Sequence, residues 1–328
     1  MTLENMINRL DDSLKTIPDL LPPDYTAGIH RENLGTLRQI FIDGAREMRK
    51  QTPAPEGVTL EVVSIPAHDG VEIELRIARP DKAAGDSIPA ILWVHGGGFI
   101  LGSAEYDDLT CMSLALQTGA VVAAVDYRLA PEHAYPVPLE DCFAAWRYLQ
   151  IEADSLRIDT ARMAIVGVSA GGGLAAGLSL LIRDHAAGPI AGQVLFYPML
   201  DDRNIAQADD DHPDTLVWSR ASNLFGWEAY LGGPAGGADT PIYAAPARAA
   251  AQAENVSGLP PTYLPVGELD LFRDENIAFA RALMAAGVPT ELHVFPGACH
   301  SFDSFVPASP LSITCRREVT AFLLKVLA

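Results

Sequence analysis

Basic residues are scarce in this chain. Its 328 residues include 23 Lys and Arg against 42 Asp and Glu, so the formal net charge is −19 at pH 7. Nucleic acids and anionic membranes are bound through basic surfaces, and this balance therefore argues against both as partners. Long apolar runs are also missing, because no stretch approaches the roughly 18 residues that a membrane-spanning helix needs. The sequence thus predicts neither a nucleic-acid-binding protein nor a membrane span.

Cysteine is scarce as well, and the lack of C-x-x-C spacing disfavours a zinc site or a disulfide framework. We expect buried thiols at Cys111, Cys142, Cys299 and Cys315. The first residues carry charges throughout and contain no apolar segment of the kind found in secretory signals. These absences predict a cytoplasmic protein.

Short apolar segments alternate with helical segments from residue 90 onward. Continuous apolar strands of this kind are typical of a parallel sheet that helices cover on both faces. They are found at 90–94, 121–125, 163–166, 193–197, 262–266 and 291–295. Before them, residues 58–80 alternate around Asp69-Gly70, which predicts an antiparallel hairpin at a sheet edge. Residues 1 to about 50 show helical spacing, with a break at Pro22-Pro23.

A long interval separates the predicted strands at 193–197 and 262–266. Insertions of this length are usually functional, most often as a lid over a site. The interval contains an acidic run, 209–211, beside His212. This cluster could bind a metal, but a solvated loop explains it better, and no metal site is expected.

The candidate nucleophile is Ser169, in the sequence Gly-Val-Ser-Ala-Gly at 167–171. This sequence follows an apolar strand and opens a helical segment, which is the setting of a G-x-S-x-G nucleophile elbow. The glycines allow the turn to tighten so that the serine oxygen is exposed. Cys299, beside His300, is the weaker alternative.

Serine needs a base that takes its proton and a third group that orients the base. In this arrangement the acid and then the histidine follow the serine along the chain, in loops after later strands. Asp270 is the predicted acid, with Glu268 and Asp274 as alternatives. His300 is the predicted base, whereas His293 lies within the last predicted strand and is expected to be a packed or surface residue.

The sequence His-Gly-Gly-Gly at 95–98 follows the first apolar strand. Acyl transfer generates an oxyanion, and each backbone N–H group directed at it raises the rate by roughly 10² to 10³. A glycine turn of this kind supplies such groups, together with the residue after the nucleophile, Ala170.

Together these motifs resemble the bacterial hormone-sensitive-lipase family (family IV) of carboxylesterases, within the α/β-hydrolase superfamily. The matching segments are HGGGF (95–99), DYRLAPE (126–132), GVSAGG (167–172), GELD (267–270), RDE (273–275), and His300 with Phe302. The resemblance implies an α/β-hydrolase fold with a mostly parallel eight-stranded sheet, flanking helices and a helical cap. It also implies the triad Ser169, Asp270 and His300, with Gly97, Gly98 and Ala170 as oxyanion donors, without a cofactor. His95 would support the loop and not act as the base.

The family's cap would comprise residues 1–48 and 199–226, and the hydrolase core would comprise residues 49–198 and 227–328. Two residues depart from the family pattern: Val168 replaces an acidic residue or threonine in the elbow, and Ser301 replaces the glycine after the last histidine. Relatives often form homodimers through the last strand and helix, and we expect a homodimer here.

The expected function is a serine carboxylesterase that hydrolyses short- to medium-chain esters through an acyl-enzyme on Ser169. Amide or peptide cleavage, or lipase action on longer chains, would use the same triad. A non-catalytic ligand-binding relative is a further alternative. Five side chains are predicted to line the substrate pocket, and packing in the hydrophobic core is the alternative role for each of them. They are Phe99, Leu216, Val217, Trp218 and Phe225.

Overall fold

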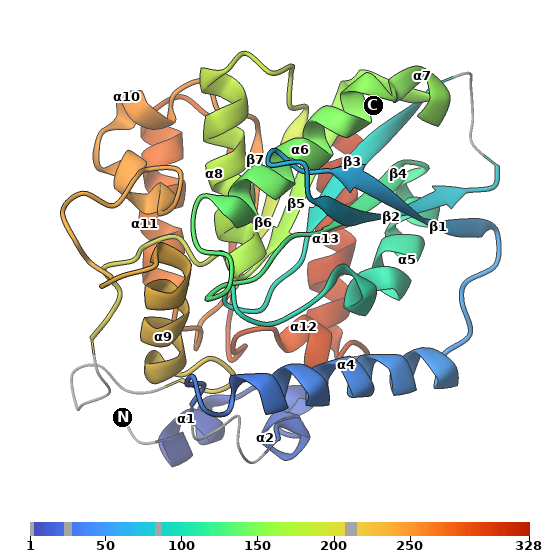
Figure 1. Cartoon of the computed structure of the whole chain (residues 1–328). Helices are drawn as coiled ribbons and strands as arrows, with labels where there is room; N and C mark the ends of the chain where they lie inside the picture. The colour runs from blue at the N-terminus through green and yellow to red at the C-terminus, as the bar shows by residue number, and fades with distance from the viewer. Residues whose placement is uncertain (1–2, 23–27, 83–86, 207–214) are drawn as a thin grey trace.

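The computed structural model describes residues 3–22, 28–82, 87–206 and 215–328, which build one eight-stranded sheet (Figure 1). The strands lie in the order β1-β2-β4-β3-β5-β6-β7-β8. β2 is antiparallel to both β1 and β4, and all other neighbours are parallel. The strands are β1 (Val58–Pro66), β2 (Glu72–Pro80), β3 (Ile88–Val94), β4 (Val121–Asp126), β5 (Ile158–Val168), β6 (Gly192–Phe196), β7 (Thr262–Gly267) and β8 (Thr290–Phe295). The predicted mostly parallel sheet is confirmed.

The burial of the strands follows from their place in the sheet. In β2, Ile73 and Leu75 are buried while Glu72 and Glu74 are exposed, as expected for a strand with one solvated face. β1 forms the sheet edge and pairs with β2 as the hairpin predicted around Asp69-Gly70. In contrast, β6 and β7 are buried along their whole lengths, because helices cover both of their faces.

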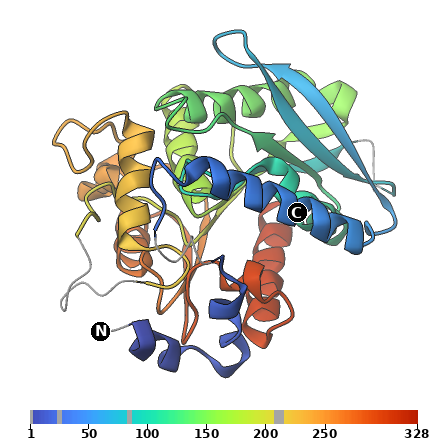
Figure 2. The same ribbon diagram turned by 60° about the horizontal axis from the view of Figure 1, so that its bottom comes forward.

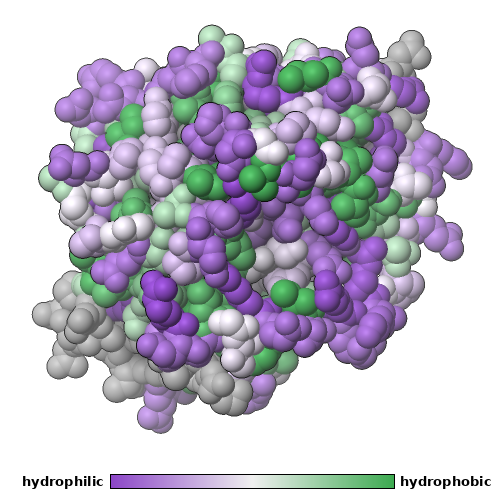
Figure 3. Space-filling view, in the orientation of Figure 1, coloured by the Kyte–Doolittle hydropathy of each residue, from purple (hydrophilic) through white to green (hydrophobic). Residues whose placement is uncertain are grey.

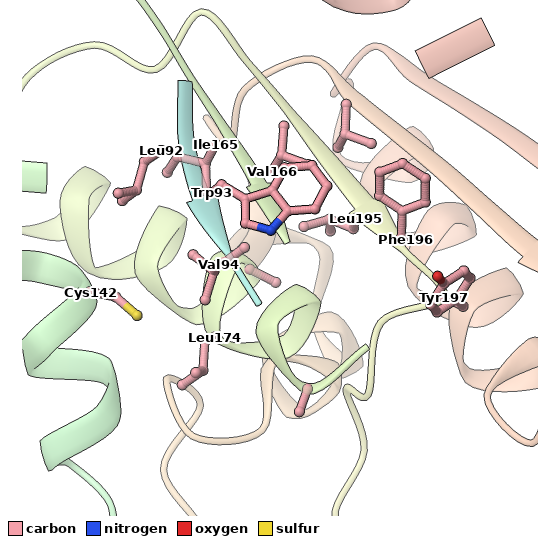
Figure 4. Packing of buried hydrophobic residues seen from close by; sticks show 14 of the residues in the cluster. Leu92, Trp93, Val94, Cys142, Ile165, Val166, Leu174, Leu195, Phe196 and Tyr197 are labelled. Atoms are coloured by element: carbon pink, nitrogen blue, oxygen red, sulfur yellow. The ribbon is translucent and has the colours of Figure 1, made fainter. Parts of the chain in front are cut away.

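Two groups of helices sandwich the sheet: α6, α8 and α11 cover one face, and α5 and α13 cover the other (Figure 1). Their bounds are α5 (Asp108–Thr118), α6 (Val137–Ile151), α8 (Ala170–Asp184), α11 (Arg273–Ala285) and α13 (Pro310–Val326). The shorter elements are α7 (Ala153–Leu156), α10 (Ala253–Val256), α12 (Phe302–Phe305) and the 3₁₀ helices η1 (Asp12–Leu14), η2 (Ala104–Asp107) and η3 (Pro246–Ala251). Figure 4 shows the core at the centre of the sheet, where Trp93 of β3 and Phe196 of β6 pack with ring centroids 6.3 Å apart.

The remaining helices lie across the end of the sheet where the parallel strands finish (Figures 1 and 2). They are α1 (Leu3–Arg9), α2 (Ile17–Leu20), α4 (Leu34–Gln51) and α9 (Arg220–Leu231). The two segments predicted to form a cap are in contact, since the backbone N–H of Ile29 donates to Ser222 Oγ at 2.9 Å. Helix α2 ends before Pro22, whereas Pro23 lies outside the described residues.

The predicted limits of the cap segments do not coincide with helix ends. Helix α4 continues beyond residue 48 to Gln51, and residue 226 lies inside α9. Both helices continue through those points without a break, although residue 226 is itself a glycine, a residue that weakens a helix. The division into cap and core therefore stays a prediction.

The surface is predominantly polar. Figure 3 shows hydrophilic residues over most of the face seen in Figure 1, with hydrophobic residues in small separate groups. The most exposed large hydrophobic side chains, Ile151 and Met48, lie on different helices, α6 and α4. Within the described ranges, no helix combines the length and the apolar character that crossing a membrane requires.

A buried ion pair joins the two ends of the interval between β6 and β7. The carboxylate of Asp202 is fully buried and accepts hydrogen bonds from Arg248 Nε at 2.6 Å and Nη2 at 2.7 Å. Gly236 N and Thr240 Oγ1 complete its partners, at 3.0 and 2.9 Å. Burial alone would raise the pKa of Asp202, but these donors hold the pKa below its usual value of 3.8.

Replacing Asp202 by Ala should lower the free energy of unfolding by about 3 kcal/mol at pH 7, because Arg248 would stay buried without a counter-charge. The pKa of Asp202 is lower in the folded than in the unfolded state, so its contribution is fully present above pH 3.8 and is lost as the pH falls through the folded value. The difference between wild type and Asp202→Ala in urea unfolding should therefore shrink towards pH 3. Glu291→Ala, at the exposed pair with Lys325, is the control and should cost at most about 0.5 kcal/mol. A loss equal to that of the control would contradict the prediction.

Candidate active site

The structure brings Ser169, His300 and Asp270 into one hydrogen-bonded chain. Ser169 Oγ lies 2.9 Å from His300 Nε2, and His300 Nδ1 lies 2.8 Å from Asp270 Oδ2. The three residues follow β5, β8 and β7, whose carboxyl ends meet at one end of the sheet. Asp270 Oδ1 accepts a further hydrogen bond from Phe272 N at 2.9 Å, which restricts the rotation of the carboxylate. All three side chains are buried.

Ser169 stands in a strained turn between β5 and α8. Its dihedral angles, φ 56° and ψ −118°, lie in a region that costs a non-glycine residue on the order of 1–3 kcal/mol. Three hydrogen bonds hold the turn: Ser169 N donates to Phe196 O, and Ser169 O accepts from Met199 N and Gly173 N. A side chain on Gly171 would collide with the carbonyl oxygens of Val94 and His95, which end β3 and begin the following loop. The elbow therefore depends on glycine at 171 for this close approach.

The alternative acids belong to other interactions. Glu268 accepts hydrogen bonds from Gly297 N at 3.0 Å and from Arg9 Nη2 at 2.6 Å, which keep the pKa of Glu268 below its usual value. Asp274 is exposed and pairs with Arg273 at 2.7 Å. Neither carboxylate is bonded to His300.

The alternative nucleophile and base also lie outside the chain of hydrogen bonds. Cys299 is fully buried, and burial raises the pKa of its thiol to about 12, so the thiolate that attack requires is not populated near neutral pH. The His293 ring stacks on Phe295 with centroids 3.7 Å apart, and its Nδ1 lies 2.7 Å from Glu318 Oε2. His293 is thus the packed histidine that its position in β8 predicted.

The loop after β3 presents unpaired backbone N–H groups next to the elbow. Gly97 and Gly98 adopt φ angles of 121° and 61°, which favour glycine, and Gly96 packs against the Cβ of Ser169. No carbonyl in the described part of the chain accepts a hydrogen bond from the N–H groups of Gly97, Gly98 or Ala170. These donors are the ones predicted for an oxyanion. The loop is closed by Leu101 N, which donates to Gly97 O at 2.8 Å.

His95 is packed at the start of this loop. Its ring stacks on Tyr127 with centroids 4.1 Å apart, and Tyr127 Oη donates to His95 O at 2.9 Å. Its Nδ1 lies 2.8 Å from Gly96 O, and burial lowers the pKa of the ring, which favours the neutral form. These contacts agree with a supporting role, as the resemblance implied.

The predicted pocket residues are mostly packed. Phe99 is fully buried and stacks on Tyr230 of α9 with centroids 4.1 Å apart, which corresponds to the core-packing alternative. Leu216 and Val217 are also buried, and Phe225 is half-buried. Trp218 differs from them, because its indole ring lies directly against Gly98 in the loop after β3.

Tyr197 is a site residue that the sequence patterns did not indicate. Its ring meets the imidazole of His300 edge-on, with centroids 4.7 Å apart, and its hydroxyl donates to Asp303 at 2.7 Å. Ser301, the residue after His300, has a left-handed φ of 54°, a conformation that favours glycine. The only sequence signal was the position of Tyr197 at the end of β6.

The other departure, Val168, is partly buried and packs beside Gly96. Among the described residues, no group of three or more His, Cys, Asp and Glu side chains is arranged to hold a metal. The acidic run 209–211 and His212 lie outside those residues.

The fold and this site define an α/β hydrolase. A family model described as the alpha/beta hydrolase fold matches residues 91–304, and the chain belongs to this family, in its hormone-sensitive-lipase (family IV) branch. The resemblance predicted from the motifs is confirmed.

Among similar proteins, esterase LipI of Mycobacterium tuberculosis is 36% identical over 236 residues, 70% of this chain and 70% of that protein. Ethyl acetate hydrolase of Pseudomonas putida is 32% identical over 257 residues, 76% of this chain and 77% of that protein. Among solved structures, a bacterial heroin esterase is 38% identical and superimposes with a TM-score of 0.88, covering 98% of this chain and 99% of that chain.

The close contact between Gly98 and the Trp218 ring can be tested by mutation. Gly98→Ala should lower the free energy of unfolding by about 2 kcal/mol, because the new methyl group would overlap the indole ring. In a Trp218→Ala background the same change should cost at least about 1 kcal/mol less, since the obstacle is gone. Urea unfolding of the four proteins of this double-mutant cycle measures the difference. Equal costs in both backgrounds would show that the two residues do not interact.

Proposed function

We propose that this protein is a serine carboxylesterase that hydrolyses short- to medium-chain carboxylic esters, with Ser169 as the nucleophile. The observation that carries the proposal is the unbroken chain of hydrogen bonds from Ser169 Oγ through His300 to Asp270. Three backbone N–H groups that have no hydrogen-bond acceptor among the described residues lie beside it, in the loop after β3 and at the start of α8. A nucleophile, an oriented base and preorganised oxyanion donors are the parts that acyl transfer needs.

In the first half-reaction, Ser169 Oγ attacks the ester carbonyl carbon while His300 Nε2 takes the hydroxyl proton. The carbonyl oxygen becomes an oxyanion that accepts hydrogen bonds from the N–H groups of Gly97, Gly98 and Ala170. Collapse of this intermediate breaks the bond to the alcohol oxygen, which receives the proton from His300. Asp270 keeps Nδ1 of the imidazole protonated and stabilises the imidazolium that forms in each step.

In the second half-reaction, a water molecule gives a proton to His300 and attacks the acyl-enzyme. The carboxylic acid leaves, and the proton returns to Ser169. Every proton transfer in this scheme uses His300, whose two ring nitrogens already face Ser169 and Asp270. The proposed chemistry therefore needs no resident cofactor.

The names of the similar proteins favour esters over amides, since two of them are called ethyl acetate hydrolase and heroin esterase. A ligand-binding protein without catalysis would have no use for a base at hydrogen-bond distance from Ser169. We also propose that residues 1–48 and 199–226 act as the cap, which shapes the acyl pocket through Trp218. A homodimer formed through the last strand, β8, and the last helix, α13, stays a prediction, as does a cytoplasmic location.

Ser169→Ala should reduce kcat for ester hydrolysis by roughly 10⁶, as expected for loss of a triad nucleophile. Asp270→Asn should reduce it by roughly 10⁴, because the amide stabilises the wrong tautomer of His300. The matched control is Asp274→Asn, which changes a nearby exposed carboxylate and should keep kcat within about twofold. Steady-state kinetics with a p-nitrophenyl ester measure all three. Near-normal hydrolysis by Ser169→Ala, or equal losses in the two Asp variants, would refute the assignment.

Substrate preference is tested with p-nitrophenyl esters from acetate to palmitate and with p-nitroacetanilide. We expect kcat/KM to be highest for the short and medium chains, because the buried site with Trp218 over Gly98 restricts the acyl group. The anilide should be a poor substrate. A maximum at palmitate would favour the lipase alternative, and efficient anilide cleavage would favour the amidase.

A further inference from the structure

One arginine connects the helix that lies across the site with the oxyanion loop. Arg38 belongs to α4, and its Nε donates to the carbonyl oxygen of Ile100 at 2.8 Å. Its Nη2 donates to the carbonyl oxygen of Ala130 at 2.8 Å. The two Nη atoms also bind the carboxylate of Glu132, at 2.7 and 2.9 Å. All three nitrogens of the guanidinium are therefore engaged.

The two carbonyls that Arg38 binds belong to the segments that hold the oxyanion loop. Ile100 N donates to Gly97 O at 3.1 Å, so the Ile100 peptide is part of the turn that orients Gly97 and Gly98. On the other side, Ala130 N donates to Phe99 O at 2.9 Å. The guanidinium thus bridges the loop after β3 and the loop after β4, at the residues that directly follow the glycines.

We propose that Arg38 is a positioning residue for the oxyanion hole, through which helix α4 sets the direction of the Gly97 and Gly98 N–H groups. This inference rests on the proposed function. A planar guanidinium presents its donors in a fixed fork, so it can hold two carbonyls and a carboxylate at set angles. A small error in those angles matters, because a displacement of about 1 Å at a reacting centre can cost on the order of 10² in rate.

The same helix provides a matched control. Arg49 Nη1 binds Asp108 Oδ2 at 2.6 Å and so also ties α4 to the core, but at α5, about 16 Å further along the helix axis. Asp108 keeps a second partner, Arg76, whose Nε lies 2.7 Å from its Oδ1. A change at Arg49 therefore removes a similar tether without touching the loop that carries Gly97 and Gly98.

The test compares Arg38→Gln with Arg49→Gln in steady-state kinetics and in inhibition by a trifluoromethyl ketone, whose adduct with serine carries an oxyanion. Arg38→Gln should lower kcat about tenfold, with KM changed less than about twofold. Its affinity for the trifluoromethyl ketone should fall by the same factor as kcat/KM. Arg49→Gln should leave both values within about twofold of wild type.

Arg38→Lys is the second variant, because it keeps a cation beside Glu132 and does not threaten folding. One ammonium group cannot reproduce the fork, so kcat should still fall, and by less than in Arg38→Gln. Equal effects of the Arg38 and Arg49 variants, or a rise in KM with kcat unchanged, would overturn the inference. If Ser169→Ala abolishes hydrolysis while both Arg38 variants match wild type, only this inference fails. Hydrolysis that survives Ser169→Ala would overturn the proposed function and this inference with it.

Discussion

The close approach of helix α8 to the end of strand β3 is the constraint on which the site depends. Gly171 lies against the carbonyl oxygens of Val94 and His95, so the first turn of α8 and the loop after β3 are in direct contact. This contact places the start of α8, with Ala170, next to the loop that carries Gly97 and Gly98. The strained backbone of Ser169 persists because hydrogen bonds to Phe196, Met199 and Gly173 oppose its relaxation. The catalytic geometry is thus a result of main-chain packing.

Most of the fold and the chemical centre could be predicted from the sequence, because both depend on local patterns. Strands buried on both faces read as continuous apolar segments, and the elbow and the glycine loop are encoded within a few adjacent residues. Tyr197 and Arg38 could not be found this way, since each acts through a contact with a residue far away in the chain. The packing of Phe99 against Tyr230 could not be predicted either, because Tyr230 lies in α9, far from Phe99 in the sequence. Helix α9 does end at a local signal, since Gly232 follows it with a left-handed φ of 67°.

Three of the arginines connect separate elements of the fold. Arg38 and Arg49 tie α4 to the loops after β3 and β4 and to α5, and Arg248 closes the interval between β6 and β7. Arginine suits such joints because it bonds carboxylates and carbonyls at fixed angles while its charge is maintained. In a chain with a net charge of −19, each of these cations is surrounded by potential partners, and the structure selects them by geometry.

The pairing of Arg9 with Glu268 has a consequence for how the site comes into being. The two residues are 259 positions apart, and Glu268 begins the loop that carries Asp270. His300 comes later still, 131 residues after Ser169. A ribosome synthesises the chain from its N-terminal side, so Ser169 emerges and its elbow can form long before His300, the proposed base, has been made. In the proposed mechanism, Ser169 becomes reactive only when β8 joins the sheet and brings His300 to it. Contacts of such long sequence separation are among the slowest that a folding chain makes.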